Sequence, residues 1–225
     1  MLEPNGQVLL GGRAASAALA RRDPRFAPLK ARFGPALHPR GRNPFAAIVE
    51  SIAHQQLSLA AGRTVYGRVE AMCAGAVRPA RLLAAGPEQL RACGLSRPKV
   101  GYVLDLAAKA QAGDLPLDRL HAMPDEAVLE ALTSVKGIGV WTAQMLLIFT
   151  LHRPDVLPTA DLGIVDAARL VLGERRRPLA RRLERIAQPW RPYRSVACWY
   201  LWRERDRLVR PATAGAPAGR ASKTT

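Results

Sequence analysis

Two glycines, Gly137 and Gly139, stand one residue apart between two apolar segments with helical spacing. Glycine has no Cβ, so a loop built on it can turn tightly and approach another backbone closely. A helix that begins just after Gly139 would direct its unpaired N–H groups outward, where they can bind phosphate. Lys136 adds a positive charge beside them. The pattern indicates a phosphate clamp, although an ordinary hairpin between two helices has the same glycine spacing.

A lone acid, Asp161, follows the hairpin and Pro158 at the start of the next apolar segment. Aspartate is favoured at helix N-caps, so a structural role explains this residue by itself. The structural and chemical roles are compatible, because a carboxylate at a helix start can stabilise positive charge that develops on a sugar. Asp155 and Asp166 are nearby alternatives. Asp161 is therefore the candidate for a carboxylate that acts close to a bound phosphate backbone.

The composition indicates a polyanionic partner. The 225-residue chain has a formal net charge of +16 and a pI of about 11.2, a balance typical of proteins that bind nucleic acid. Cys73, Cys93 and Cys198 lack CxxC spacing, which favours reduced thiols over a disulfide framework, a zinc site or an iron–sulfur cluster. No apolar run approaches the ~20 residues of a membrane span, and no signal peptide is recognisable. We therefore expect a cytosolic protein without a membrane partner.

Alanine and leucine dominate the chain, and alternation of β-branched residues is nearly absent, so we expect an all-α fold. Proline and N-cap residues mark where helices begin: Asn43-Pro44, Ser58, Pro87, Pro98, Pro124 and Asp161. The expected helices cover about 13–21, 45–54, 59–73, 140–151 and 161–172, with others opened by Pro87, Pro98 and Pro124 and a last one ending near 209. Residues 210–225 hold no core-forming residue, and we expect them to be disordered.

Several motifs together resemble the helix-hairpin-helix (HhH-GPD) superfamily of DNA glycosylases, in its alkylbase or 3-methyladenine DNA glycosylase II branch. They are Gln55-Gln56-Leu57-Ser58, Gly94-Leu95-Ser96 followed by Lys99, the 132–143 hairpin, Pro158 followed by Asp161, and the 190–195 segment. The resemblance runs from about 43 to 203. It implies a two-lobed helical fold without an N-terminal β domain, since the first 42 residues show no strand pattern. The expected parts are an N-terminal helical segment at 1–42 that packs with the C-terminal lobe, a helical barrel lobe at 43–160 with the hairpin at 125–151, and a C-terminal lobe at 161–209.

The resemblance also implies a role for each site residue. Asp161 would be the catalytic acid, and Trp141 and Trp202 would stack the extruded base in a pocket. The implied DNA-binding residues are Gln55, Gln56, Leu57, Ser58, Lys136, Gly137, Ile138, Gly139 and Thr142, with Gln56 or Leu57 as the side chain that fills the gap left by the base. Backbone carbonyls of Thr133, Val135 and Gly137 would hold a monovalent cation, Na⁺ or K⁺, at the hairpin.

The activity implied is excision of N3- and N7-alkylated purines from double-stranded DNA in base excision repair. Bifunctional relatives carry a lysine nucleophile two residues after the second hairpin glycine, where this chain has Trp141, so we expect a monofunctional enzyme without lyase activity. We expect no required cofactor, a monomer, and a cytoplasmic, nucleoid-associated location. Two alternatives stay open: a glycosylase for uracil or another neutral or mismatched base, and a non-catalytic protein that uses the hairpin as a DNA clamp.

Overall fold

The structure is a computed structural model that describes residues 7–39 and 43–209. Its long elements are helices: α1 (Ala15–Arg22), α2 (Ala27–Phe33), α3 (Pro44–His54), α4 (Leu59–Met72), α5 (Pro79–Ala92), α6 (Arg97–Ala112), α7 (Asp125–Thr133), α8 (Val140–Phe149), α9 (Leu162–Leu172), α10 (Ala180–Ile186) and α11 (Arg194–Val209). Two 3₁₀ turns, Pro24–Phe26 and Gln188–Trp190, join them. The all-α expectation is confirmed. None of the described helices is long and apolar enough to cross a membrane.

The predicted capping residues begin the helices that position the site. The Asn43 side chain accepts hydrogen bonds from the N–H groups of Phe45 and Ala46 at 3.0 and 3.3 Å, and so starts α3. The Ser58 hydroxyl accepts from the Ala61 N–H at 3.3 Å at the start of α4. Side-chain acceptors satisfy N–H groups that have no partner inside the helix. The ends of α3 and α4 that frame the 55–58 segment are therefore set locally by the sequence.

The described part of the N-terminal segment carries no β domain, as expected, but it contains two short strands that the sequence did not indicate. Strands β1 (Gln7–Leu9) and β2 (Leu37–Pro39) pair antiparallel, with Val8 opposite His38. Each strand has three residues, too few to show alternation, and the pairing joins residues about thirty positions apart. Helices α2 and α10 and the first half of α5 were also not expected. The break at Gly86, whose φ of 68° is left-handed, separates that half from the helical turn that Pro87 opens.

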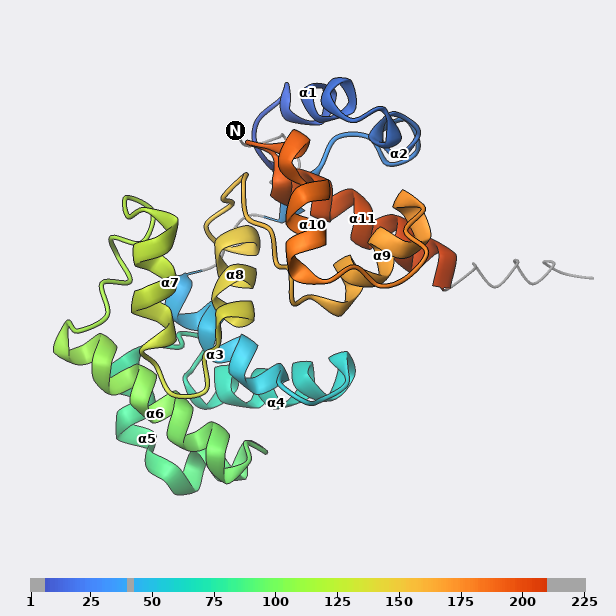
Figure 1. The fold of residues 1–225 in the computed structure, drawn as a ribbon. Helices are drawn as coiled ribbons and strands as arrows, with labels where there is room; N and C mark the ends of the chain where they lie inside the picture. Colours follow the sequence, from blue (N-terminus) through green and yellow to red (C-terminus); the bar gives the residue numbers. More distant parts are fainter. Residues whose placement is uncertain (1–6, 40–42, 210–225) are drawn as a thin grey trace, which may run out of the picture.

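The buried side chains form two clusters, which define two lobes. The first lobe comprises α3 to α8, and the second combines α1 and α2 with α9 to α11. In Figure 1 the N-terminal helices α1 and α2 lie beside α10 and α11, at the opposite end of the molecule from α5 and α6. The predicted disordered tail, 210–225, lies outside the described residues.

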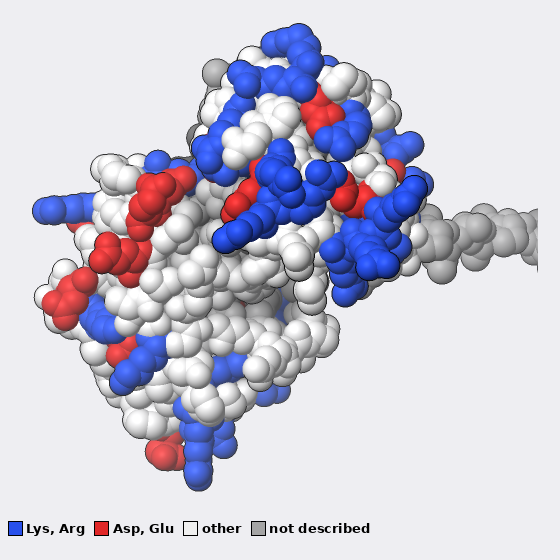
Figure 2. All heavy atoms as spheres, in the orientation of Figure 1, with Lys and Arg blue, Asp and Glu red and all other residues white. Residues whose placement is uncertain are grey.

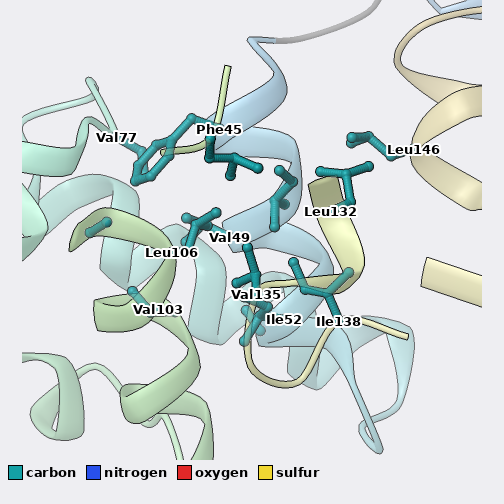
Figure 3. Close-up of a cluster of buried hydrophobic side chains, with 14 of the residues drawn as sticks. Phe45, Val49, Ile52, Val77, Val103, Leu106, Leu132, Val135, Ile138 and Leu146 are labelled. Atoms are coloured by element: carbon teal, nitrogen blue, oxygen red, sulfur yellow. The ribbon is translucent and has the colours of Figure 1, made fainter. Parts of the chain in front are cut away.

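The hairpin loop between α7 and α8 is anchored in the core of the first lobe. Val135 and Ile138, which flank Gly137 closely, are buried, and Figure 3 shows both side chains pointing inward near Ile52 of α3. Burying two aliphatic side chains stabilises a loop by about 1.5–3 kcal/mol each. Because the loop is fastened from inside, its backbone at 136–139 is presented at the surface in one conformation.

Candidate active site

A cavity of about 1000 Å³ lies where the two lobes meet. Its walls come from the end of α3 and the 55–56 segment, from α6, from the hairpin and α8, and from the start of α9 and α11. Its lining side chains include Gln55, Gln56, Lys99, Tyr102, Trp141, Thr142, Phe149, Asp161, Trp202 and Arg203. The cavity has the size typical of small-molecule sites, which range from about 300 to 1000 Å³.

Asp161 is the N-cap of α9 and a cavity wall residue, only 9% exposed. Its Oδ1 accepts hydrogen bonds from the Ile164 N–H and from the Trp202 indole N–H, both at 2.8 Å. Its Oδ2 accepts from the Trp141 indole N–H at 2.8 Å. Among the described residues Oδ1 thus accepts two bonds and Oδ2 one. The carboxylate is held in one orientation by three donors and keeps a lone pair on Oδ2 for a further contact.

The two predicted pocket tryptophans meet at this carboxylate from opposite lobes. Trp202, on α11, stacks on Phe149 of α8 with ring centroids 5.5 Å apart and an interplanar angle of 29°. Trp141, in the first turn of α8, is 46% exposed even though its indole N–H is bonded to Asp161. An exposed indole whose edge is fixed offers a flat aromatic face at the cavity mouth. Both residues were predicted to line the pocket, and in the structure both indole N–H groups donate to the Asp161 carboxylate.

The two hairpin glycines differ in what they require. Gly137 has a φ of +78°, and a Cβ placed there would lie 2.2 Å from Cδ2 of Tyr102. Gly139 has an ordinary φ of −94° and is the N-cap of α8, and a Cβ placed there would meet nothing within 4 Å. The positive φ and the close approach of Tyr102 are therefore enough to account for glycine at position 137. Gly139 faces open space at a helix N-terminus that has no capping side chain, where an anion can approach the first N–H groups.

Lys136, Ile138 and Thr142 lie at different depths in the hairpin. The Lys136 side chain is exposed, and its Nζ lies 3.9 Å from Oδ1 of Asp105 on α6. The Ile138 side chain is buried and its N–H donates to the Val135 carbonyl at 3.1 Å, so it supports the loop from the core side. Thr142 is buried in the cavity wall. Within this trio, the lysine is the side chain that reaches open solvent.

The Asp105 carboxylate binds the hairpin from behind. It accepts the Lys136 backbone N–H at 2.9 Å and pairs with the Lys109 ammonium at 3.1 Å. Burial acts to raise the pKa of Asp105, but this N–H and the two lysines outweigh it, so the pKa of that carboxyl is lowered. A charged Asp105 at neutral pH keeps the loop in place.

Two of the three carbonyls predicted to hold a cation accept hydrogen bonds from the protein. The Val135 carbonyl accepts the Ile138 N–H at 3.1 Å, and the Gly137 carbonyl accepts the Gln55 side-chain amide at 2.9 Å. Two of the three oxygens, those of Val135 and Gly137, thus each accept one protein hydrogen bond and keep a second lone pair. The monovalent cation therefore stays a prediction.

The 55–58 segment joins α3 to α4 beside the hairpin. Gln55 ends α3 and its amide crosses to Gly137, whereas Ser58 is occupied as the cap of α4. Gln56 has a φ of +57°, a left-handed conformation uncommon for a residue with a side chain, and lines the cavity. Leu57 is 43% exposed. Gln56 and Leu57 are therefore presented at the surface, as a side chain that enters a base stack must be.

Several cavity residues were not assigned a role from the sequence. Lys99 is buried and donates to the Ala53 carbonyl, and Tyr102 packs on Gly137. Arg203 lies at the rim with its guanidinium carbon 4.6 Å above the Trp199 ring. Lys99 belongs to a motif that carried the family resemblance, and Tyr102 follows it by one helical turn, which is a signal that sequence reasoning could have used.

Charge is unevenly distributed over the face seen in Figure 2. Lysine and arginine side chains gather over the second lobe, around α9, α10 and α11, and acidic side chains on the first lobe cluster away from that patch. Some arginines of the second lobe are paired, for example Arg177 with Asp166 of α9 at 2.6 Å. A basic surface on the lobe that carries Asp161 is suited to a polyanion.

Comparison with known proteins agrees with this geometry. The chain is 32% identical to a DNA-3-methyladenine glycosidase from Bacillus halodurans, whose structure superposes with a TM-score of 0.81 over 91% of this chain and 94% of that one. It resembles a Schizosaccharomyces pombe 3-methyladenine DNA glycosylase solved in complex with abasic DNA, with a TM-score of 0.74, 28% identity and coverage of 85% and 96%. DNA-3-methyladenine glycosylase 1 of that yeast is 30% identical over 72% of each chain.

The family follows from the sequence itself. Residues 49–192, which include the 55–58 segment, the hairpin and Asp161, match the HhH-GPD superfamily of base excision DNA repair proteins. This span contains Gly137 and Gly139 of the hairpin, and Trp141 and Asp161 of the cavity. Trp202 lies beyond its C-terminal end. The chain belongs to the HhH-GPD superfamily of base excision DNA repair proteins.

Proposed function

We propose that this protein is a monofunctional DNA glycosylase that extrudes an N3- or N7-alkylated purine from duplex DNA and hydrolyses its bond to deoxyribose. The observation that carries the proposal is the Asp161 carboxylate, held by three N–H donors in the wall of an aromatic cavity beside the hairpin. Relatives named as 3-methyladenine glycosylases support the lesion class.

The chemistry assigned to Asp161 is electrostatic. When the C1′–N bond breaks, its electron pair leaves with the base and the sugar becomes oxocarbenium-like. The carboxylate stabilises that positive charge, with Oδ2 as the oxygen that still has a lone pair for the sugar or for water. Water then bonds to C1′ and loses a proton, which leaves an abasic site.

An alkylated purine suits the cavity because it needs little help to leave. N3- or N7-alkylation makes the base cationic, so the departing base is neutral and requires no general acid. A cationic base is attracted to electron-rich aromatic faces such as those of Trp141 and Trp202. A neutral base such as uracil would instead need hydrogen-bond donors placed against it, and a panel of duplexes with alkylated, deaminated and mismatched bases separates these substrates.

The absence of lyase activity is part of the proposal. Trp141 occupies the position of the hairpin lysine of bifunctional relatives, and the Lys136 ammonium lies toward Asp105 on the exposed side of the loop. A Schiff base needs an amine that reaches C1′. The expected product is an intact strand with an abasic site, which breaks only after treatment with alkali.

Binding to duplex DNA should weaken steeply with salt, because the hairpin N–H groups, Lys136 and the basic surface of the second lobe would contact phosphates. With a slope of about −0.9 per phosphate, two or more contacts lower the affinity about tenfold or more between about 50 and 200 mM salt. Fluorescence anisotropy with an undamaged duplex measures this. An affinity that does not change over that range would contradict the phosphate clamp.

Gly139→Ala should weaken binding to damaged and undamaged duplexes alike. The new Cβ would stand in open space in front of the α8 N-terminus, where the phosphate is expected. Alanine is a poorer N-cap than glycine, so the unfolding free energy should fall by no more than about 1 kcal/mol. Gly101→Ala, on α6 and also facing open space, is the matched control and should leave affinity unchanged. A loss of affinity for damaged DNA alone would indicate that Gly139 contacts the extruded base and not a phosphate.

A further inference from the structure

One face of α6 contacts both segments that are expected to bind DNA, the end of α3 that leads into the 55–58 segment and the hairpin loop between α7 and α8. Lys99, Tyr102, Asp105 and Lys109 follow one another at three, three and four residues and so share a face. Lys99 contacts the end of α3, Tyr102 packs on Gly137, Asp105 accepts the Lys136 N–H and Lys109 donates to the Ser134 carbonyl. Lys99 thus contacts the end of α3, just before the 55–58 segment, and the other three residues contact the hairpin.

Lys99 is an unusual residue to find at its position. It is only 9% exposed and lies in the first turn of α6, where the helix dipole disfavours a cation. Burial alone lowers the pKa of its ammonium group. A methionine of similar shape would avoid both penalties. A specific contact must therefore account for the lysine.

That contact is with the last turn of α3. The Lys99 ammonium donates to the Ala53 carbonyl at 2.8 Å, one of the terminal carbonyls that lack a partner inside the helix. Gln55 follows two residues later and bonds to the Gly137 carbonyl at 2.9 Å. Gln56, with its left-handed φ of +57°, comes directly after these two anchors. A left-handed residue with a side chain persists only where its surroundings hold it.

We propose that Lys99 is a positioning residue for base extrusion: by fixing the end of α3 against α6, it sets Gln56 and Leu57 in register with the hairpin. The proposal rests on the function proposed above. Lys99 acts through the 55–58 segment and does not touch the base or the sugar. Its loss should therefore slow the lesion-dependent step more than it weakens general binding to DNA.

A double-mutant cycle tests this. In single-turnover base release, Lys99→Met should lower the rate about ten- to a hundredfold, as expected for a misplaced group. In a background of Gln56→Ala/Leu57→Ala, which lacks the extruding side chains, the same change should lower the rate by less than about twofold further. Affinity for undamaged duplex should stay within about twofold. Lys30→Met, an exposed lysine on α2, is the matched control for loss of charge.

The opposite results overturn the proposal. A rate loss that is undiminished in the Gln56→Ala/Leu57→Ala background, or a Lys99→Met rate equal to wild type, would show that Lys99 does not act through this segment. If thermal unfolding shows that Lys99→Met does not fold, Lys99→Gln, which is too short to reach Ala53, takes its place. Lys99→Arg keeps a donor and should retain most of the rate.

A readout that does not require catalysis separates this inference from the proposed function. The fluorescence of 2-aminopurine beside the target base rises when the stack opens, and Lys99→Met should reduce that rise. Wild-type protein that opens the stack but releases no base would contradict the glycosylase proposal and leave the Lys99 test in force. An equal rise with wild type and Lys99→Met would contradict the role of Lys99.

Discussion

Asp161→Asn should lower the single-turnover rate of base release by about a hundred- to a thousandfold, which corresponds to about 3–4 kcal/mol of transition-state stabilisation. The substitution removes the charge that opposes the oxocarbenium ion. It also turns an amide N–H₂ group toward a donor: with the amide oxygen kept on Ile164 and Trp202, the nitrogen faces the Trp141 indole N–H. Loss of charge and loss of orientation therefore act together.

The N-cap itself should be kept in this variant, because asparagine is as good an N-cap as aspartate, and loss of the Trp141 bond should lower the free energy of unfolding by about 1–2 kcal/mol. Thermal unfolding and affinity for undamaged DNA are the checks. Asp166→Asn is the matched control, since Asp166 lies one turn further along α9 and pairs with Arg177 rather than with the cavity tryptophans. Base release by Asp161→Asn at the wild-type rate, or an equal loss in Asp166→Asn, would remove Asp161 from the chemistry.

Gly137→Ala should destabilise the protein by about 2–5 kcal/mol, the sum of a left-handed conformation forced on a residue with a Cβ and of overpacking. The φ at this position is +78°, and the new methyl would lie within 2.4 Å of Cδ2, Cε2 and Cγ of Tyr102. Because Cγ is close to the backbone, rotation of the ring alone cannot relieve the contact. Denaturant unfolding measures the loss.

A second substitution separates the two causes of that loss. In Gly137→Ala/Tyr102→Ala the clash is removed and the backbone strain remains, so the double variant should be more stable than the sum of the single effects predicts. Gly139→Ala is the internal comparison, since its φ is −94° and its Cβ meets nothing. Equal stability of the Gly137→Ala and Gly139→Ala variants would contradict the account of the hairpin.

The hairpin and the acid were predictable because their signals are local. Gly137, Gly139, Pro158 and Asp161 fall within 25 residues, and each acts through backbone geometry or capping that a short sequence specifies. The same holds for the starts of α3 and α4 at Asn43 and Ser58. These features need no knowledge of distant contacts, and the structure contains them where the sequence indicated.

Features that depend on tertiary contacts were not predictable. β1 and β2 exist only because each pairs with the other, and Lys99 acquires its partner only when α6 packs beside the end of α3. The left-handed conformation of Gln56 could not be predicted, because glutamine has no preference for a positive φ. The bond from Gln55 to Gly137, which joins the segment to the hairpin, links residues 82 positions apart. The motifs identified the surface, whereas the network that aligns its parts required the fold.

Glycosylase activity is measured by single-turnover incubation of the wild-type protein with duplex DNA that contains 7-methylguanine, followed by chromatography of the released base and a denaturing gel. We expect free 7-methylguanine and a DNA strand that stays intact until alkali is added. Strand cleavage without alkali would contradict the monofunctional mechanism and direct attention to an amine such as that of Lys99. Tight, salt-sensitive binding without release of any base from the lesion panel would contradict catalysis and favour a DNA clamp.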